Sequence, residues 1–132
     1  MSYMSTTGPC RTTTQHAGVE AKISVPYSYD PQTAGGKVQI VATPADGRKI
    51  KLLSYTWNGK AVNATANFCS SAAGSLVAGT TLTGELSSIT SVAPFFNAGD
   101  NLQGVGTCVV NEDLCVSGAQ GGAGTVVYSL VP

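Results

Sequence analysis

Apolar and polar residues alternate with a period of two along much of the chain, as they do in a β-strand with one buried and one exposed face. Residues 19–25 show this best, because Val, Ala, Ile and Val alternate there with Glu, Lys and Ser. Pro26 is expected to end this strand, since proline cannot donate a ladder hydrogen bond. Further strands are expected at residues 37–43, 49–57, 75–77, 80–86, 102–110 and 122–131.

The expected strand at 49–57 contains a one-residue phase change. Its apolar positions shift from 50 and 52 to 53, 55 and 57, and a β-bulge would produce this shift. Asn58-Gly59 follows directly and favours a two-residue type I′ turn, which needs a positive φ at both positions. The resulting hairpin would pair Trp57 with Lys60 and Tyr55 with Val62.

The last run, residues 122–131, is largely apolar on both faces. Val126, Tyr128 and Leu130 would lie on one face of the strand, and Val127 and Val131 on the other. Such a strand needs cover on both sides, from the core on one side and from a second sheet or another subunit on the other. We therefore expect this strand to close the sheet and to supply a self-interface. Its candidate residues are Val126, Val127, Tyr128 and Leu130.

No segment of ten or more residues has a convincing period of 3.6 residues. About eight short strands, with turn signals every 8 to 12 residues or so, indicate an all-β fold, an antiparallel β-sandwich. An eight-strand jelly roll is expected, and an immunoglobulin-like sandwich is the alternative. Residues 1–18 are polar and aperiodic, so we expect an N-terminal arm, either disordered or ordered on a neighbour, ahead of a β-sandwich domain at residues 19–132.

Other segments have the composition of turns and loops. Residues 27–36 and 94–101 contain proline and glycine and are expected to be loops, each carrying two aromatic residues. The glycine-rich stretch at 118–124 is expected to be a flexible connection, because a strand rather than a helix follows it. Residues 63–73 are rich in Ala, Asn and Ser and remain ambiguous.

Charged residues make up only 11% of the chain, and the formal net charge is zero. This is less than half of the roughly 25% that is usual. Free monomers generally carry net charge for colloidal stability, so a homo-oligomer, either a dimer or a trimer, or burial in a larger assembly is expected. Seven basic residues spread along the chain do not form the footprint of a nucleic-acid-binding protein. No stretch approaches the roughly 18 apolar residues of a membrane span, and no signal peptide is expected, so we expect synthesis in the cytoplasm and no membrane partner.

No catalytic arrangement is evident, and we expect neither enzyme activity nor a cofactor. The single histidine, His16, lies in the polar arm without organised partners, whereas nucleophilic catalysis needs several positioned groups. Glu112 and Asp113 are the one adjacent acidic pair, and residues 111–113 are expected to be a solvated turn. A calcium site there, or at residues 97–101, would lack the alternating oxygen ligands of known calcium loops.

The four cysteines are Cys10, Cys69, Cys108 and Cys115. They form no Cys-x-x-Cys motif and have no histidine at metal spacing, so zinc is not expected. Cys108 and Cys115 flank a short turn and are candidates for a disulfide that would contribute about 2 to 3 kcal/mol. A bridge between Cys10 and Cys69 is the second candidate. Cytosolic synthesis opposes both bridges, and later exposure to an oxidising medium would allow them.

Arg48, Lys49 and Lys51 form the one basic cluster of the sequence, next to a turn. They are either a solvated hairpin tip or a contact to an acidic partner surface. In the arm, Tyr3 and Met4 are the candidates for anchoring on a neighbouring subunit.

Four stretches together resemble the small jelly-roll decoration, or cement, proteins of tailed bacteriophage capsids. They are the short polar start, the strand ending in Trp57-Asn-Gly-Lys-Ala-Val62, the loop Asn97-Ala-Gly-Asp-Asn-Leu102 and the closing run Gly122-Ala-Gly-Thr-Val-Val-Tyr-Ser-Leu-Val131. The resemblance implies a structural virion protein on the capsid surface. It would bind the outside of the shell as a dimer or trimer, at contacts between major capsid protein subunits, and brace the shell against internal DNA pressure. Tyr3, Met4, Arg48, Lys49 and Lys51 are then the candidate capsid contacts.

A receptor-binding or glycan-binding module of a phage fibre or an adhesin is the alternative. Tyr27, Tyr29, Phe95 and Phe96 in the expected loops could stack on sugar rings. They could equally close the ends of the sandwich. Other structural roles, such as a pilus or tail-tube component, also remain open.

Overall fold

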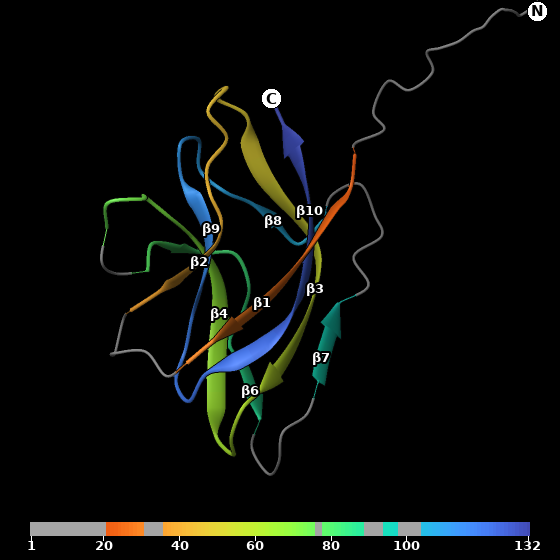
Figure 1. Cartoon of the computed structure of the whole chain (residues 1–132), viewed down its shortest axis with the longest axis vertical. Coiled ribbons are helices and arrows are strands. Elements are labelled where there is room, and N and C mark those ends of the chain that lie inside the picture. Colours follow the sequence, from red (N-terminus) through yellow and green to blue (C-terminus); the bar gives the residue numbers. More distant parts are fainter. Residues whose placement is uncertain (1–20, 31–35, 76–77, 89–93, 98–103) are drawn as a thin grey trace, which may run out of the picture.

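The computed structural model describes residues 21–30, 36–75, 78–88, 94–97 and 104–132 (Figure 1). These residues form two antiparallel β-sheets that pack against each other, and they include no helix. The predicted all-β class and the antiparallel β-sandwich are therefore confirmed. The predicted arm at residues 1–18, with Tyr3, Met4, Cys10 and His16, lies outside the described residues.

The described ranges contain ten strands, where the sequence predicts about eight. They are β1 (Ile23–Tyr29), β2 (Val38–Val41), β3 (Lys49–Gly59), β4 (Ala64–Ser71), β5 (Thr80–Thr81), β6 (Leu86–Ser88), β7 (Pro94–Asn97), β8 (Gly106–Thr107), β9 (Asp113–Ser117) and β10 (Gly122–Val131). The first sheet has the order β1-β10-β3-β7, and β8 also pairs with β3. The second sheet has the order β2-β9-β4-β5, and β6 also pairs with β4. The first four strands therefore alternate between the two sheets.

Alternate side chains from both sheets fill the space between them. The largest fully buried apolar side chains are Trp57, Phe68, Ile50, Leu52, Leu114, Val116 and Val126. Full burial of one such aliphatic or aromatic side chain contributes about 1.5 to 3 kcal/mol. The rings of Tyr55 on β3 and Phe68 on β4 lie 4.8 Å apart between centroids, so the two sheets meet at this aromatic contact.

The phase change predicted in residues 49–57 is confirmed as an irregularity in β3. Val127 of β10 pairs with Ser54, but Tyr128 pairs with Leu52, so Leu53 is an extra residue. A residue inserted in this way moves the following side chains to the other face. Leu52 before the insertion and Trp57 after it are consequently both fully buried.

The hairpin predicted at Asn58-Gly59 is wrong. β3 continues through both residues, and Gly59 pairs with Gly122 of β10. A positive φ occurs instead at Asn63 (64°), in the connection that carries the chain to β4 in the second sheet. Pairing with the distant β10 has therefore overridden the local turn signal, and the pairs predicted across the turn do not form.

Pro26 does not end the first strand. β1 extends from Ile23 to Tyr29, with Pro26 opposite Thr125 of β10. Proline is tolerated because β1 is an edge strand, where an N–H group directed away from the sheet is not needed. Tyr27 and Tyr29 consequently lie in a strand rather than in the predicted loop.

The glycines at the start of β10 are packed closely, although the sequence predicts a flexible connection at 118–124. A Cβ atom on Gly122 would overlap Nε1 of Trp57, and one on Gly124 would overlap the carbonyl oxygen of Thr56. Nε1 of Trp57 donates a hydrogen bond to the hydroxyl of Tyr29 at 3.0 Å in this region. Glycine therefore lets the aromatic residues of β1 and β3 approach β10.

The remaining elements partly match the predictions. The expected strand at 37–43 is confirmed as the shorter β2, and a turn at residues 45–47 follows it. The ambiguous segment at 63–73 forms β4, and the loop predicted at 94–101 includes β7, which pairs with β3. The prediction at 80–86 is divided between β5 and the start of β6, and that at 102–110 yields the short β8 within its described part.

Candidate functional site

The basic cluster is divided between a loop and a sheet face. Arg48 lies just before β3, and its Nε donates to Oδ2 of Asp46 at 2.7 Å. The backbone N–H of Arg48 donates to Oδ1 of the same carboxylate at 3.1 Å, and this bond is the main reason why the pKa of Asp46 is lowered. Both side chains are about half exposed (49% and 52%). Arg48 is therefore a loop cation already paired with its neighbour.

Lys49 and Lys51 belong to the outer face of β3, because they alternate with the fully buried Ile50 and Leu52. The strands of the first sheet contain no aspartate or glutamate. Lysines are thus the charged residues of these strands. We call this surface the lysine face; it comprises the outward side chains of β1, β10 and β3 together with Lys22.

Lys22 extends the lysine face across the sheet. It immediately precedes β1, whose Ile23 pairs with Tyr128 of β10, while Lys51 of β3 pairs with Ser129. The antiparallel register therefore brings Lys22 and Lys51 to opposite sides of β10 at the level of Ser129. Lysines from two strands thus approach the same part of the face.

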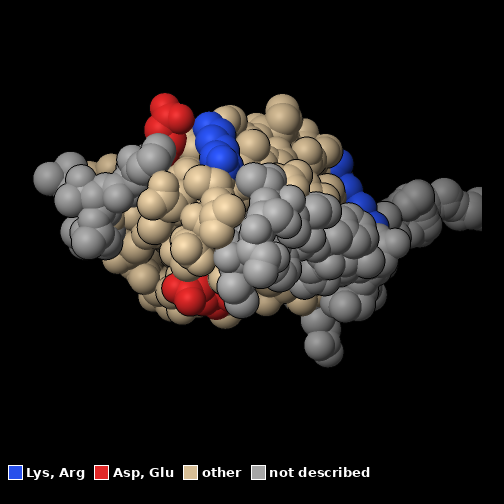
Figure 2. Space-filling view, turned by 90° about the horizontal axis from the view of Figure 1, so that it is seen from below, with Lys and Arg blue, Asp and Glu red and all other residues tan. Residues whose placement is uncertain are grey.

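Charged side chains are sparse on other parts of the surface. In the view from below in Figure 2, the described part of the surface is mainly uncharged, and basic and acidic groups on it are few. One of the pairs in the described part of the chain joins Lys60 Nζ and Asp30 Oδ1 at 3.4 Å, and Asp30 is largely exposed. An exposed pair of this kind contributes little to stability.

The candidate self-interface residues divide between the two faces of β10. Val126 is fully buried, and Tyr128 and Leu130 pack against the core. Val127 alternates with these residues and lies on the lysine face. The self-interface prediction is therefore wrong for Val126, and Tyr128 and Leu130 mainly serve the core. The reason is that these three side chains lie on the inner face of β10, which packs on the core between the two sheets.

The three described cysteines are free, buried thiols beside β4 and β9. Cys69 on β4 and Cys115 on β9 lie directly opposite each other in the antiparallel register. They alternate with core residues of the same strands and so lie on the outer side of the second sheet, yet both are 0% exposed. Cys108, in contrast, belongs to the core cluster.

The predicted disulfide between Cys108 and Cys115 is not formed. The N–H of Cys108 donates to the carbonyl oxygen of Ile50 at 2.8 Å, which attaches this residue to the first sheet. The Sγ atoms of Cys108 and Cys115 lie 3.8 and 3.9 Å from the carbonyl oxygen of Asp113. The turn therefore brings both thiols near one carbonyl group, but one faces the core and the other the outer side. The candidate Cys10–Cys69 bridge involves a residue outside the described ranges.

The pKa values of the two paired thiols are shifted in opposite directions. The neighbouring Cys115 thiol is the main cause that lowers the pKa of Cys69, and the N–H of Gly79 and the charge of Lys37 lower it further. Interaction with Cys69, together with burial, raises the pKa of Cys115. Burial also raises the pKa of Cys108 to about 12. Cys69 is consequently the thiol of the pair that ionises more readily.

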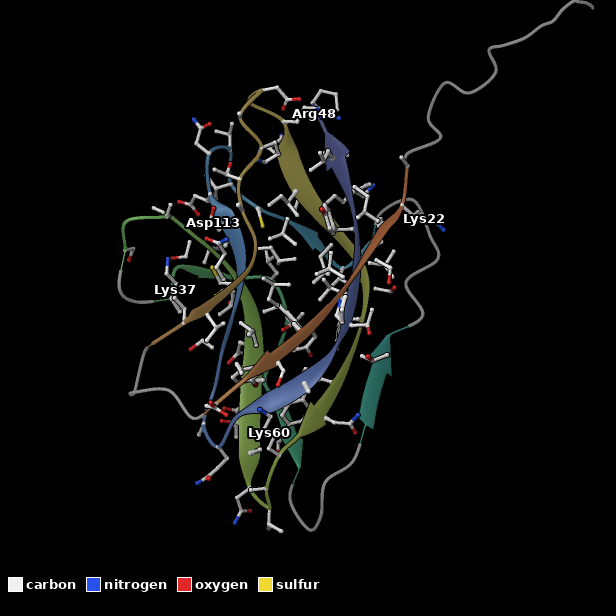
Figure 3. The ribbon with its side chains drawn as sticks, viewed as in Figure 1. Lys22, Lys37, Arg48, Lys60 and Asp113 are labelled. Carbon is white, nitrogen blue, oxygen red and sulfur yellow. The ribbon has the colours of Figure 1, made fainter. Side chains whose placement is uncertain are left out.

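Polar groups surround the thiol pair on the second sheet. Nζ of Lys37 donates to Oγ of Ser71 at 2.8 Å and to the carbonyl oxygen of Ala72 at 2.6 Å. Asp113 is 2% exposed, and its Oδ1 accepts the N–H of Thr43 at 2.8 Å. Figure 3 shows Lys37 and Asp113 on the same side of the molecule, opposite Lys22. These contacts connect Lys37, just before β2, with the end of β4, and Thr43, just after β2, with β9.

The solvated turn predicted at residues 111–113 is correct only for Asn111, which is exposed and has a φ of 64°. Glu112 is half-buried and accepts a hydrogen bond from Oγ of Ser70 at 2.6 Å. Asp113 is buried, as described above. A run of polar residues can therefore begin a buried strand when the neighbouring strands supply hydrogen-bond donors.

The loop aromatics proposed for sugar stacking are turned inward in β1. The ring of Tyr27 lies 6.3 Å from that of Tyr29 and meets Phe68 edge-on at 5.7 Å. The hydroxyl of Tyr27 donates to the carbonyl oxygen of Thr56 at 2.7 Å. Burial raises the pKa of both tyrosines above that of a free phenol. The side chains of Phe95 and Phe96 are outside the described part of the structure.

Sequence reasoning did not identify the pairing of Cys69 with Cys115 or the contacts of Lys37 and Asp113. Each depends on β2, β4 and β9 lying side by side, and these strands are distant in the sequence. The one local signal is the alternation within β4, where Cys69 and Ser71 occupy the positions opposite to the core residues.

Within the described ranges, no three His, Cys, Asp or Glu side chains are grouped so that they could hold a metal ion. No helix in these ranges is long and apolar enough to cross a membrane. Comparisons of the chain with protein-family models, with curated proteins and with solved structures gave no match. The candidate surfaces are therefore interpreted from their own geometry.

Proposed function

We propose that this protein is a structural virion protein, a capsid decoration or cement protein that binds the outer surface of a major capsid protein lattice and stabilises the shell. The lysine face is the observation that carries the proposal. Lys22, Lys49 and Lys51 are the charged residues of this face within the described ranges, and the strands that form it contain no aspartate or glutamate. A surface rich in basic residues favours a partner surface of the opposite sign.

The rest of the lysine face suits contact with a protein surface. Between the lysines lie small and aliphatic side chains, among them Ser24, Val127 and Val131. Cations around small and aliphatic residues resemble the polar rim and apolar centre of protein interfaces. Many copies, each bridging neighbouring capsid subunits, would favour the assembled shell over dissociated subunits by mass action.

The strand order supports the jelly-roll form of the sandwich that the resemblance implies. The pairs β1–β10, β2–β9, β3–β8 and β4–β6 are nested, as if a long antiparallel ribbon were rolled into two sheets. Counting β5 with β6, and β7 with β8, as two interrupted strands gives eight strands in all. An eight-strand jelly roll is a common architecture of viral capsid proteins.

Association into a dimer or trimer is part of the same proposal. It is supported by the low charged fraction of 11%. The glycan-binding alternative has less support, because Tyr27 and Tyr29 pack inside the sandwich and are not available for stacking on a sugar.

The first test is whether the chain is part of a virus particle. Particles produced from the genome that encodes the chain are purified on a density gradient, and their proteins are identified by mass spectrometry. Intact particles are also labelled with an antibody against the chain and viewed by electron microscopy. We expect the chain in the particles and the label on their surface. A chain absent from purified particles, or reached by antibody only after the shell is broken, would contradict the proposal.

The second test concerns the lysine face. Particles that lack the chain are mixed with the purified wild type or with the double variant Lys49→Glu/Lys51→Glu. Charge reversal should weaken binding at least about tenfold, and added salt should weaken the binding of the wild type. Lys60→Glu is the matched control, because Lys60 pairs with Asp30 beyond the end of β3 and lies outside the lysine face. Equal binding of both variants would exclude this face as the contact.

A further inference from the structure

We propose that Cys69 and Cys115 are an oxidation site, at which hydrogen peroxide closes a disulfide across β4 and β9. The inference is independent of the proposed function, because it rests on the second sheet alone. It also differs from the two bridges that the sequence suggests, which join Cys108 to Cys115 or Cys10 to Cys69.

Strand register places the two residues at the distance that a disulfide requires. Cys69 and Cys115 are direct partners in the antiparallel ladder. Residues opposite each other in such a ladder have Cα atoms about 4.5 or 5.5 Å apart, and disulfides span Cα separations of roughly 4.4 to 6.8 Å. Both cysteines alternate with core residues of their strands, so their side chains lie on the same, outer side of the sheet. Bond formation therefore needs side-chain rotation and no displacement of strands.

The surroundings divide the two thiols into a nucleophile and a partner. The neighbouring Cys115 thiol, the N–H of Gly79 and the charge of Lys37 each lower the pKa of Cys69. These three interactions stabilise a thiolate at Cys69. Interaction with Cys69, together with burial, raises the pKa of Cys115, which keeps its proton until the second step. A thiolate beside a second thiol is the arrangement that converts a sulfenic acid into a disulfide.

The reaction proceeds in two balanced steps. The Cys69 thiolate attacks one oxygen of hydrogen peroxide, the O–O bond breaks, and hydroxide leaves with the proton lost from Cys69 as water. The sulfur is then a sulfenic acid. The Cys115 sulfur attacks it, the S–O bond breaks as the S–S bond forms, and the departing hydroxyl takes the Cys115 proton and leaves as a second water. Two thiols lose two electrons in total, and one peroxide is reduced to two waters.

Peroxide has limited access to the two thiols, but it does not need to pass through the core to reach them. Both thiols are 0% exposed, yet they lie on the outer side of the second sheet. The amine of Lys37 is bound to Ser71 and Ala72, and its charge acts on both thiols. Peroxide is close to water in size, and local opening on this outer side is sufficient to admit it.

The positions of the glutamates make the test direct. Cleavage after Glu20, Glu85 and Glu112 gives four fragments with one cysteine each: residues 1–20, 21–85, 86–112 and 113–132. The full-length protein is reduced, treated with hydrogen peroxide, blocked with an alkylating agent, unfolded and cleaved, and its fragments are weighed without reductant. We expect fragment 21–85 to be linked to fragment 113–132, with the link broken by reductant.

Three results would overturn the proposal. They are a link between fragments 86–112 and 113–132, a link to fragment 1–20, and four unlinked fragments, whether oxidised or not. Cys108→Ala is the matched control and should keep the link, whereas Cys69→Ala and Cys115→Ala should lose it. Lys37→Gln should slow the linkage several-fold without changing which fragments are joined, because it removes a charge that favours the thiolate.

Thermal unfolding provides a second readout. A disulfide that joins strands so far apart in the sequence should raise the melting temperature by about 10 °C in the wild type and in Cys108→Ala. Reductant should reverse the shift. Peroxide treatment that forms the link but leaves the melting temperature unchanged would mean that the bond does not constrain β4 and β9.

Discussion

In both sheets inward and outward residues alternate, but the outward residues of the two sheets differ in character. On the first sheet the alternate positions carry Lys49 and Lys51, and the face is cationic. On the second sheet they carry Cys69, Cys115 and Asp113, which are at most 2% exposed and engaged in hydrogen bonds. A period of two indicates only which side of a strand faces the core. Whether the other side is a contact surface or a sealed layer depends on what the neighbouring strands bring to it.

Stability and binding should therefore respond differently to changes on the two sheets. Substitutions in closely packed or hydrogen-bonded positions should destabilise the fold, and substitutions on the lysine face should affect contacts with other proteins. The four predictions below are ordered by their expected effect on the free energy of unfolding.

The largest effect is expected for Gly124→Ala in β10. A Cβ atom there would overlap the backbone oxygen of Thr56, which cannot rotate away, so the strands must shift. The expected loss is about 3 kcal/mol, at the upper end for overpacking. Urea unfolding followed by fluorescence measures it. Gly84→Ala is the control, because a Cβ atom at Gly84 meets nothing within 4 Å. Equal stability of the two variants would show that β10 is not packed as described.

The second effect is expected for Asp113→Ala on the sealed side of the second sheet. The change removes a buried carboxylate and leaves the N–H of the half-buried Thr43 without its acceptor. The expected cost is about 2 kcal/mol, as for other buried donors that lose a partner. Asp46→Ala, in an exposed loop, should cost less than about 0.5 kcal/mol in the same urea experiment. A reversed order of the two variants would contradict the buried role of Asp113.

The third effect is a loss of stability at alkaline pH that comes from the tyrosines inside the sandwich. Burial raises the pKa of Tyr27, Tyr29 and Tyr55 above the free-phenol value of 10.0. Since each folded-state pKa lies above the unfolded one, their stabilising effect is complete below pH 10 and is lost as the pH rises from there through the folded-state values. Each tyrosine contributes a slope of up to about 1.4 kcal/mol per pH unit in that window.

Urea midpoints measured between pH 9 and pH 11 test this prediction. Tyr27→Phe should have a shallower decline than the wild type, whatever its stability at neutral pH. Identical slopes for the two proteins would mean that the Tyr27 phenol ionises as readily in the folded chain as in the unfolded one.

The smallest effect on stability is expected on the lysine face. Lys49→Gln/Lys51→Gln should change the free energy of unfolding by less than about 0.5 kcal/mol, as is usual for substitutions of this kind at a surface. The same variant should bind less well to particles that lack the chain. A large loss of stability would instead make these lysines structural, and the contrast between the two sheets would fail.

The sequence predicts local features of this fold well and long-range features poorly. The phase change in β3 could be recognised because it involves neighbouring residues, and the alternation that defines β-strands is local in the same way. The hairpin predicted at Asn58-Gly59 was wrong because the local turn preference stabilises the chain less than continuous pairing with β10 does. Strand β10 belongs to the far end of the chain. The flexible connection predicted around Gly122 and Gly124 was wrong for a similar reason. In a sequence, a glycine needed for close approach by aromatic residues cannot be distinguished from a glycine that gives flexibility.

The candidate sites show the same limit. The lysines at 49 and 51 could be selected from the sequence, but their relation to Lys22 depends on the pairing of β1, β10 and β3. The cysteine pair was assigned incorrectly because Cys108 and Cys115 are close in sequence, whereas Cys69 becomes the neighbour of Cys115 only when β4 joins β9.

Cryogenic electron microscopy of particles carrying this chain tests the central claim most directly, because it reveals which side of the sandwich meets the shell. The account predicts that β1, β10 and β3 lie against the capsid lattice, with Lys22, Lys49 and Lys51 at the contact and the second sheet directed outward. Particles in which these lysines point into solvent, or whose surface carries no copy of the chain, would contradict it.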